Sequence, residues 1–360
     1  MSDRSHPMRI HVLHLVAVFV AVLVGCTRPG DASPVLKIGL IAPFEGLGRS
    51  MGYAALGEVK GELALANEAR RFGRYKVALV AVNDNSDGRS AAFQAQALAQ
   101  DRDVLAVIGP WTTVTAQGAA PVLAAAGIPS LVAGVVEPGL DQIWPLCPPA
   151  SEIAAAMVSA GKRSGVGHLV IAGPDNPLAR ALEQAAPDAL RVASPTQDAS
   201  QFCAKAAMAS VYRGHCRATV LYTGDAAQGA DDLVRWRSSG WRGALLGGPD
   251  LAALPSPPWG ALSARAGAAA EGAQAVVCTL PGELGSKRGD DASPEALSTL
   301  AEQSAKLIID AIAQDVAIHD RPSRPGVQAA LAEHGIRPGL TWIRCVSGAW
   351  QAGGQETPKE

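Results

Sequence analysis

Short apolar runs alternate with longer amphipathic segments along most of the chain, beginning at Val35. In the longer segments apolar residues recur at helical spacing, as they do at Leu56, Val59 and Leu63. Strands that alternate with helices are typical of parallel sheets covered by helices, so the pattern predicts an α/β fold. Eight strands are expected, at residues 36–42, 76–82, 104–108, 130–133, 168–172, 218–222, 244–246 and 274–278.

Two runs of these units are separated by the segment WPLCPP at residues 144–149. Its three prolines cannot join the interior of a sheet, but they suit an extended crossover, and we place a lobe boundary there. Further crossovers are expected near residues 274–280 and in the apolar segment LTWIRCV at 340–346. These boundaries predict a first lobe of residues 35–144 plus 280–340 and a second lobe of residues 145–279 plus 341–360.

The beginning of the chain has the pattern of an export signal. Arg4 and Arg9 precede an apolar run at residues 15–24, which is shorter than the roughly 20 residues of a membrane span. The run ends in Leu-Val-Gly-Cys, which resembles the bacterial lipobox, whose cysteine becomes the lipidated first residue of the mature protein. We therefore predict a lipoprotein signal peptide at residues 1–25, lipid attachment at Cys26 and a tether at 26–34. An ordinary signal peptide with a chance cysteine is the alternative.

Composition limits the partners of the chain. A length of 360 residues with 48% apolar composition is enough for two cores. The formal net charge of -2, with no basic run, argues against a nucleic-acid partner, which would require a clustered basic surface. The resemblance of the first segment to a lipobox implies a location on the periplasmic side of a bacterial cell envelope, anchored to the membrane by the lipid.

Five cysteines follow Cys26, and an exported protein can oxidise some of them. No C-x-x-C motif is present, so the sequence does not favour a redox or zinc site. Buried thiols are the simplest interpretation, and a disulfide between Cys278 and Cys345, where two expected crossovers meet, is the alternative. The pairing stays open for Cys147, Cys203, Cys216, Cys278 and Cys345.

Four motifs in order, LKIGLIAP (36–43), VNDNSD (82–87), VIGP (107–110) and GIPS (127–130), resemble type I periplasmic binding proteins, above all the branched-chain amino-acid group. The resemblance extends over the mature chain and is weaker after Cys147. It implies two Rossmann-like lobes with parallel sheets, joined by three crossover hinge strands, and a ligand cleft between them. It also implies a monomer that delivers a small polar ligand to an ABC permease, without catalysis and without a cofactor.

The stretch after the third expected strand is the main candidate for ligand binding. Gly109 and Pro110 turn the chain, and Thr112 or Thr113 begins the next helix. Hydroxyls and free backbone N–H groups at a helix N-terminus favour an anion. The resemblance implies that Thr113 contacts a ligand carboxylate, with Thr112 the second choice; helix capping alone is the alternative.

Other positions depart from the family pattern. Val136 stands where relatives commonly have Ser or Thr, which leaves Gly134 and its neighbours to offer backbone groups only. Met51 stands where relatives often have an aromatic ring, and with Val136 it is expected to form an apolar wall. Asp250, in the turn GGPD, resembles the acid that pairs with a ligand amino group, although a turn-forming aspartate is equally expected.

Two further functions stay open. The same fold can serve as a protein-interaction module in the envelope, with an empty cleft, and the lost contact residues favour that alternative. The motif GRSMG at 48–52 matches the Gly-x-Ser-x-Gly of hydrolases, but the preceding strand ends too early for a nucleophile elbow. No histidine spacing indicates a metal site.

Overall fold

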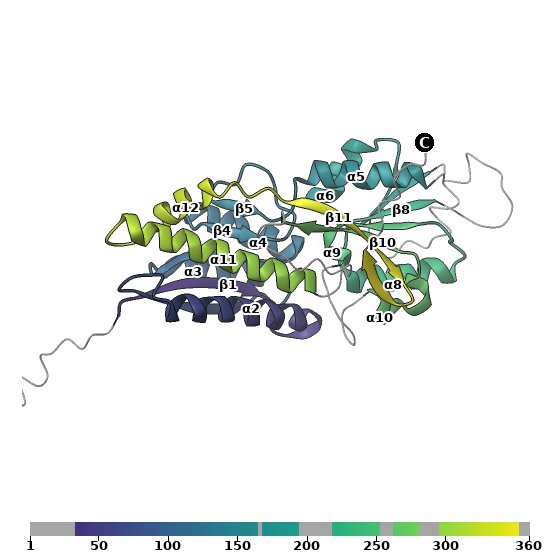
Figure 1. Cartoon of the computed structure of the whole chain (residues 1–360). Helices are drawn as coiled ribbons and strands as arrows, with labels where there is room; N and C mark the ends of the chain where they lie inside the picture. The colour runs from purple at the N-terminus through teal and green to yellow at the C-terminus, as the bar shows by residue number, and fades with distance from the viewer. Residues whose placement is uncertain (1–32, 165–167, 194–217, 253–261, 281–294, 353–360) are drawn as a thin grey trace, which may run out of the picture.

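The computed structural model describes residues 33–164, 168–193, 218–252, 262–280 and 295–352. The signal segment, Cys26, Cys203 and Cys216 lie outside these residues. The described residues form two sheets that lie side by side, each with its own helices (Figure 1).

The first sheet has the strand order β2-β1-β3-β4-β5, and every neighbouring pair is parallel. We call this sheet, with the helices that pack on it, the first lobe. Its strands are β1 (Val35–Ala42), β2 (Lys76–Asn83), β3 (Val104–Ile108), β4 (Ser130–Val132) and β5 (Ile143–Pro145). Its helices are α2 (Arg49–Glu68), α3 (Gly88–Gln100), α4 (Thr113–Ala125), α11 (Glu295–Ile318) and α12 (Arg324–Glu333), with the short 3-10 helix η1 (Gly46–Gly48) before α2.

The second sheet, with its helices, is called the second lobe and has the order β12-β11-β10-β9-β8-β6-β7. Its first five strands in sequence are parallel, and β11 and β12 add an antiparallel edge. The strands are β6 (Leu169–Gly173), β7 (Leu190–Ala193), β8 (Thr219–Tyr222), β9 (Leu245–Gly247), β10 (Gln274–Thr279), β11 (Gly339–Val346) and β12 (Ala349–Ala352). The helices are α5 (Ala150–Arg163), α6 (Pro177–Ala185), α8 (Ala226–Ser238), α9 (Pro249–Ala252) and α10 (Leu262–Ala266), followed by η2 (Gly267–Ala270).

The chain passes between the lobes three times: from β5 to α5, from β10 to α11, and from α12 to β11 (Figure 1). The fold predicted from the sequence is therefore confirmed, with two mostly parallel sheets. All eight expected strands are present, and β5, β7 and β12 are additional. Pro145 ends β5, which is an edge strand, where a missing backbone donor costs no hydrogen bond within the sheet.

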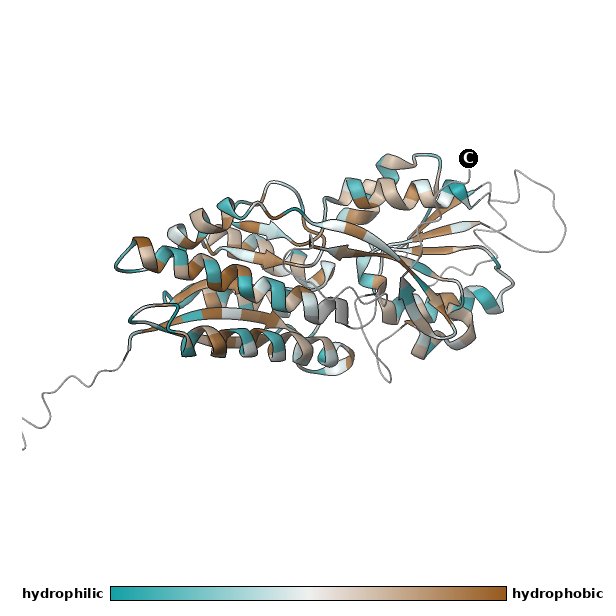
Figure 2. Ribbon diagram, in the orientation of Figure 1, coloured by the Kyte–Doolittle hydropathy of each residue, from teal (hydrophilic) through white to brown (hydrophobic). Residues whose placement is uncertain are grey.

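Local sequence explains where the helices lie and which face they bury. Val59 and Leu63 on α2 are buried, as are Ile153 and Met157 on α5, and these are the faces that the apolar spacing predicted. Asp87 caps α3 by accepting a hydrogen bond from the backbone N–H of Ser90. Figure 2 shows strands that are largely hydrophobic between helices of mixed character.

A disulfide joins Cys147, which follows β5, to Cys278 in β10, so it links two of the three crossovers. The suggested Cys278–Cys345 pair is wrong, and so is the interpretation of Cys147 and Cys278 as buried thiols. The physical reason is the antiparallel register of β10 and β11, which pairs Cys278 with Leu340. Cys345 therefore lies at the far end of that pairing, where it is buried and free.

Candidate functional site between the lobes

The turn after β3 aims α4 at the second lobe. Gly109 has a φ of +88, and a Cβ there would lie 2.2 Å from the carbonyl oxygen of Ile41, so only glycine fits. The Gly109–Pro110 peptide is cis, and Trp111 is buried behind it. The backbone N–H of Ala133 donates to the carbonyl of Pro110 at 3.0 Å, which ties this turn to the segment after β4.

Thr112 is the N-cap of α4, and its hydroxyl serves the helix. The hydroxyl accepts from the backbone N–H of Thr115 and lies 2.9 Å from the Thr115 hydroxyl, and the Thr115 side chain accepts from the backbone N–H of Thr112. This reciprocal arrangement is a capping box, which satisfies two otherwise unpaired groups. Capping, which the sequence left as the alternative for these threonines, is what the Thr112 hydroxyl does.

Thr113 faces the second lobe and is almost fully buried. Its backbone N–H donates to both carboxylate oxygens of Asp250, at 3.2 and 3.1 Å. Its hydroxyl accepts from the backbone N–H of Val135 at 3.2 Å. Thr113 and Asp250, predicted for opposite ends of a ligand, are therefore in direct contact with each other across the lobes.

Asp250 lies in α9, directly after β9, and only 9% of its surface is exposed. Burial raises the pKa of Asp250 to about 6, and the hydrogen bonds from Thr113 only partly oppose this effect. The negative charge of Asp225 acts in the same direction as burial. In the described part of the chain no basic side chain forms a salt bridge with Asp250, so the N-terminal end of α4 is its main stabilising partner.

The remaining predicted residues lie on the first lobe. A Cβ on Gly134 would lie 2.3 Å from the carbonyl oxygen of Thr112, so this glycine allows the two segments to pack closely. Val136 is half-buried and lines a cavity of about 340 Å³. Met51 is fully buried in α2 and is absent from the residues that line this cavity. Of the two residues predicted for an apolar wall, Val136 lines the cavity and Met51 does not.

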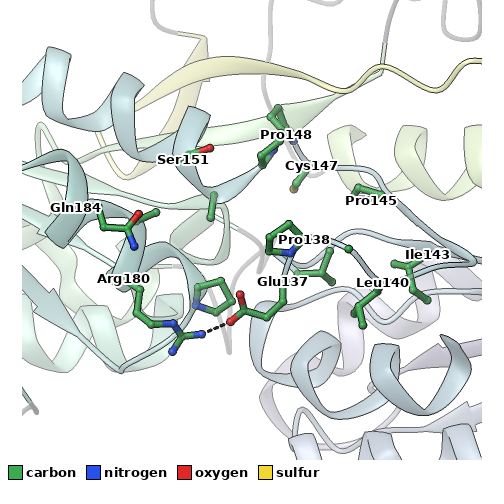
Figure 3. A pocket seen from close by; sticks show the side chains of 16 residues that line it. Glu137, Pro138, Leu140, Ile143, Pro145, Cys147, Pro148, Ser151, Arg180 and Gln184 are labelled. Atoms are coloured by element: carbon green, nitrogen blue, oxygen red, sulfur yellow. Dashed lines mark hydrogen bonds and ion pairs between the residues drawn. The ribbon is translucent and has the colours of Figure 1, made fainter. Parts of the chain in front are cut away.

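The cavity lies between the lobes and is lined mostly by apolar side chains (Figure 3). One wall is the segment from Val136 to Pro145 of the first lobe, and the other is formed by the crossover at residues 147–149, the beginning of α5 and one face of α6. Glu137 and Arg180 form an ion pair across it, and Arg180 also contacts Asp175 at 3.2 Å. A site of this kind suits a small organic ligand that buries apolar surface and meets a few polar groups.

The cavity and the Thr113–Asp250 contact are neighbours on both lobes. On the first lobe, Val135 bonds to Thr113 and the next residue lines the cavity. On the second lobe, Leu178 follows the cavity-lining Pro177 and packs close to Gly248, in the turn that leads to Asp250. The two features therefore belong to one interlobe region.

Sequence reasoning missed several residues of this region. Glu137 and Arg180 are ordinary surface charges in the sequence, and only the fold brings them together. The prolines at positions 138, 145, 148, 149 and 177 were a usable signal, because a cluster of rigid residues after a strand is typical of a shaped wall. Ser50, at the centre of the hydrolase-like motif, is exposed in the first turn of α2 and does not sit at the end of a strand.

The family model for periplasmic binding proteins matches residues 35–335, so the chain belongs to this family. Among curated proteins none matches this chain. A leucine-binding protein from Thermotoga maritima is similar in structure at 19% identity and a TM-score of 0.67, covering 88% of this chain and 97% of that one.

Two further structures have the same fold. A possible leucine/isoleucine/valine-binding protein from Rhodopirellula baltica has 16% identity and a TM-score of 0.68, with 93% of this chain and 100% of that chain covered. An ABC-transporter solute-binding protein from R. palustris, in complex with 4-hydroxybenzoate, has 14% identity and a TM-score of 0.64, with 89% and 95% covered. The family consists of transporter substrate-binding proteins, which bind ligands and are not enzymes. No helix within the described residues is both long and apolar enough to span a membrane.

Proposed function

We propose that this chain is the extracytoplasmic solute-binding lipoprotein of an ABC importer and that it holds a small organic ligand between its lobes. The observation that carries the proposal is the interlobe region itself. There a helix N-terminus and a buried carboxylate lie beside a cavity of about 340 Å³ that both lobes line. Buried polar groups next to an apolar cavity are what a selective small-molecule site requires.

The ligand we propose is an amino acid, an amide or a related organic acid. Thr113 and Thr112 would serve its acidic end, Asp250 a basic end, and Gly134 and Val136 the surrounding wall, while Met51, fully buried in α2, would act only by packing within the first lobe. The capping role of the Thr112 hydroxyl makes Thr113 the better candidate of the two threonines. The apolar lining supports a ligand with a hydrophobic body, which agrees with structural neighbours that bind leucine or 4-hydroxybenzoate.

A thermal-shift screen of the mature protein tests this proposal. The panel contains amino acids, amides, urea, small organic acids, hydroxybenzoates and fatty acids. A true ligand at 100 times its dissociation constant adds about 2.7 kcal/mol to the free energy of unfolding. Ala181→Trp, which fills the cavity from α6, should abolish the shift. Leu65→Trp on the exposed face of α2 is the matched control and should leave the shift unchanged.

The lipid anchor and the permease are part of the same proposal. Lipidation of Cys26 would keep the lobes near a permease in the membrane, joined through the short tether at residues 26–34. Cys26→Ser should move the protein from the membrane fraction to the soluble periplasmic fraction without changing ligand affinity. Retention of the Cys26→Ser variant in the membrane would contradict the anchor.

A second candidate is a protein-interaction module that uses the same fold with an internally satisfied cleft. The Thr113–Asp250 contact favours it, because groups expected to hold a ligand hold each other. Absence of any shift in the screen, together with capture of a specific envelope protein, would favour this second function over solute binding.

A further inference from the structure

The N-terminus of α4 already holds a carboxylate. The first free N–H of a 13-residue helix, that of Thr113, donates to both oxygens of Asp250. The N–H of Thr115 is taken by the capping hydroxyl of Thr112. A helix N-terminus favours negative charge, so Asp250 occupies the position in which an external carboxylate would be most stable.

Asp250 reaches this position from the other lobe, and no described residue of its own lobe forms a salt bridge with it. The described residues provide no cation within salt-bridge distance of it, and the nearby charged group on its own lobe is another acid, Asp225. Asp250 is also buried, with only 9% of the residue's surface exposed. A buried carboxylate without a cation is costly unless donors are aimed at it. The donor aimed at it belongs to Thr113.

We propose that Asp250 is an internal carboxylate that fills the anion-binding end of α4 while the lobes are in contact, so that a ligand carboxylate binds there only by displacing it. This inference rests on the proposed function, because it concerns the acidic end of the same ligand site. It makes Asp250 a specificity-determining residue that weakens binding of carboxylate ligands. If Asp250 only paired with a ligand ammonium, it would instead strengthen the binding of ligands that carry an amino group.

Truncation of the side chain creates a direct test. Asp250→Ala removes one carboxylate group, which has the size and charge of formate. Sodium formate should therefore bind the Asp250→Ala variant at the N-terminus of α4 and raise its Tm, with sodium chloride of equal ionic strength as the control. The parent protein should not respond to formate, because its own carboxylate already occupies the position.

A second substitution shows whether formate binds at Thr113. Pro is favoured at the first position of a helix and removes the N–H, and Thr112 has the extended backbone (φ -121, ψ 158) that a following proline needs. Asp250→Ala/Thr113→Pro should lose the formate response, corresponding to affinity weaker by about tenfold or more. The matched variant Asp250→Ala/Thr113→Val loses the hydroxyl but keeps the N–H, so it should show a weakened response to formate where the proline variant shows none.

The outcomes separate this inference from the proposed function. The inference is overturned if folded Asp250→Ala does not respond to formate, or if the proline variant responds equally well. It is also overturned if Asp250→Ala stays unfolded in formate, because the external carboxylate then fails to replace the internal one. A formate response without any solute that stabilises the parent protein would leave the inference standing and reject solute binding.

Discussion

Two polar contacts between described residues of the two lobes differ in their surroundings. Asp250 and Thr113 meet in a buried place, whereas the side chains of Arg180 and Glu137 are 45% and 52% exposed. Water and salt screen the exposed ion pair, so it contributes at most about 1 kcal/mol. The buried contact has no such screening, and removing one partner leaves the other without compensation. Substitutions at the buried contact are therefore expected to change stability more than substitutions at the exposed ion pair.

The largest expected effect comes from removing the covalent link that supports both contacts. The Cys147–Cys278 bond closes a loop with a sequence separation of 131 residues, for which the chain-entropy model gives about 5 kcal/mol of stabilisation. Cys147→Ala/Cys278→Ala should lower the free energy of unfolding in urea by that order. Cys345→Ala, which removes the buried free thiol, is the volume control and should cost much less. Equal losses would show that the disulfide adds nothing.

The pH dependence of stability tests the buried contact alone. The pKa of Asp250 is raised to about 6, so the native state holds a proton that the unfolded state, with the usual value of 3.8, releases earlier. Stability from this group is therefore complete below pH 3.8 and is lost as pH rises to about 6, by about 3 kcal/mol. Asp250→Asn should remove that slope in unfolding curves measured between pH 4 and 7.

A second buried carboxyl, that of Asp84, shows how much of the pH dependence of stability comes from Asp250. Burial also raises the pKa of Asp84 to about 6, within the first lobe, where one of its carboxylate oxygens is buried without a hydrogen-bond partner. Asp84→Asn should remove a similar slope but leave the formate response of Asp250→Ala intact. A pH profile unchanged by either substitution would contradict the burial argument.

Removing the Thr113 hydroxyl, beside the contact with Asp250, should change stability less. Thr113→Val leaves the buried N–H of Val135 without its acceptor, which should cost about 1–3 kcal/mol in chemical unfolding. It should also weaken binding of any confirmed carboxylate ligand. Thr341→Val, at an exposed position of β11, is the control and should be close to neutral. Unchanged ligand affinity in Thr113→Val would mean that the hydroxyl does not contact the ligand.

The smallest effect is expected at the exposed ion pair. Arg180→Ala should lower stability by less than about 1 kcal/mol, and added salt should erase the difference. Arg265→Ala, which breaks a surface pair with Asp231 inside the second lobe, is the control. A loss at Arg180 that is much larger than the loss at Arg265 would show that this pair, too, sets the contact between the lobes.

The sequence predicted the parts of the fold that depend on local periodicity. The spacing of Val59 and Leu63 identified a buried helix face, and all eight expected strands are present. The added strands are short or lie at a sheet edge, as β5 and β12 do, where few apolar residues are needed. The lobe boundaries at residues 144, 279 and 340 stay predictions.

The site was less accessible to sequence reasoning, because its contacts join distant residues. The pattern identified Thr113 and Asp250 separately, but their contact spans 137 residues and depends on how the lobes meet. The pairing of Cys147 with Cys278 likewise depends on the register of β10 against β11. Glu137 and Arg180 carried no signal at all, since exposed charges are common on any surface.

The position of the disulfide has a consequence for the connectivity of the molecule. Residues 147–278, which hold most of the second lobe, form a covalent ring inserted into the first lobe's chain. A single peptide-bond cleavage anywhere in that ring leaves one molecule under non-reducing conditions and two fragments after reduction. The entry and exit of the insertion also stay adjacent when the second lobe unfolds, so the first lobe keeps the ends of its own chain in place.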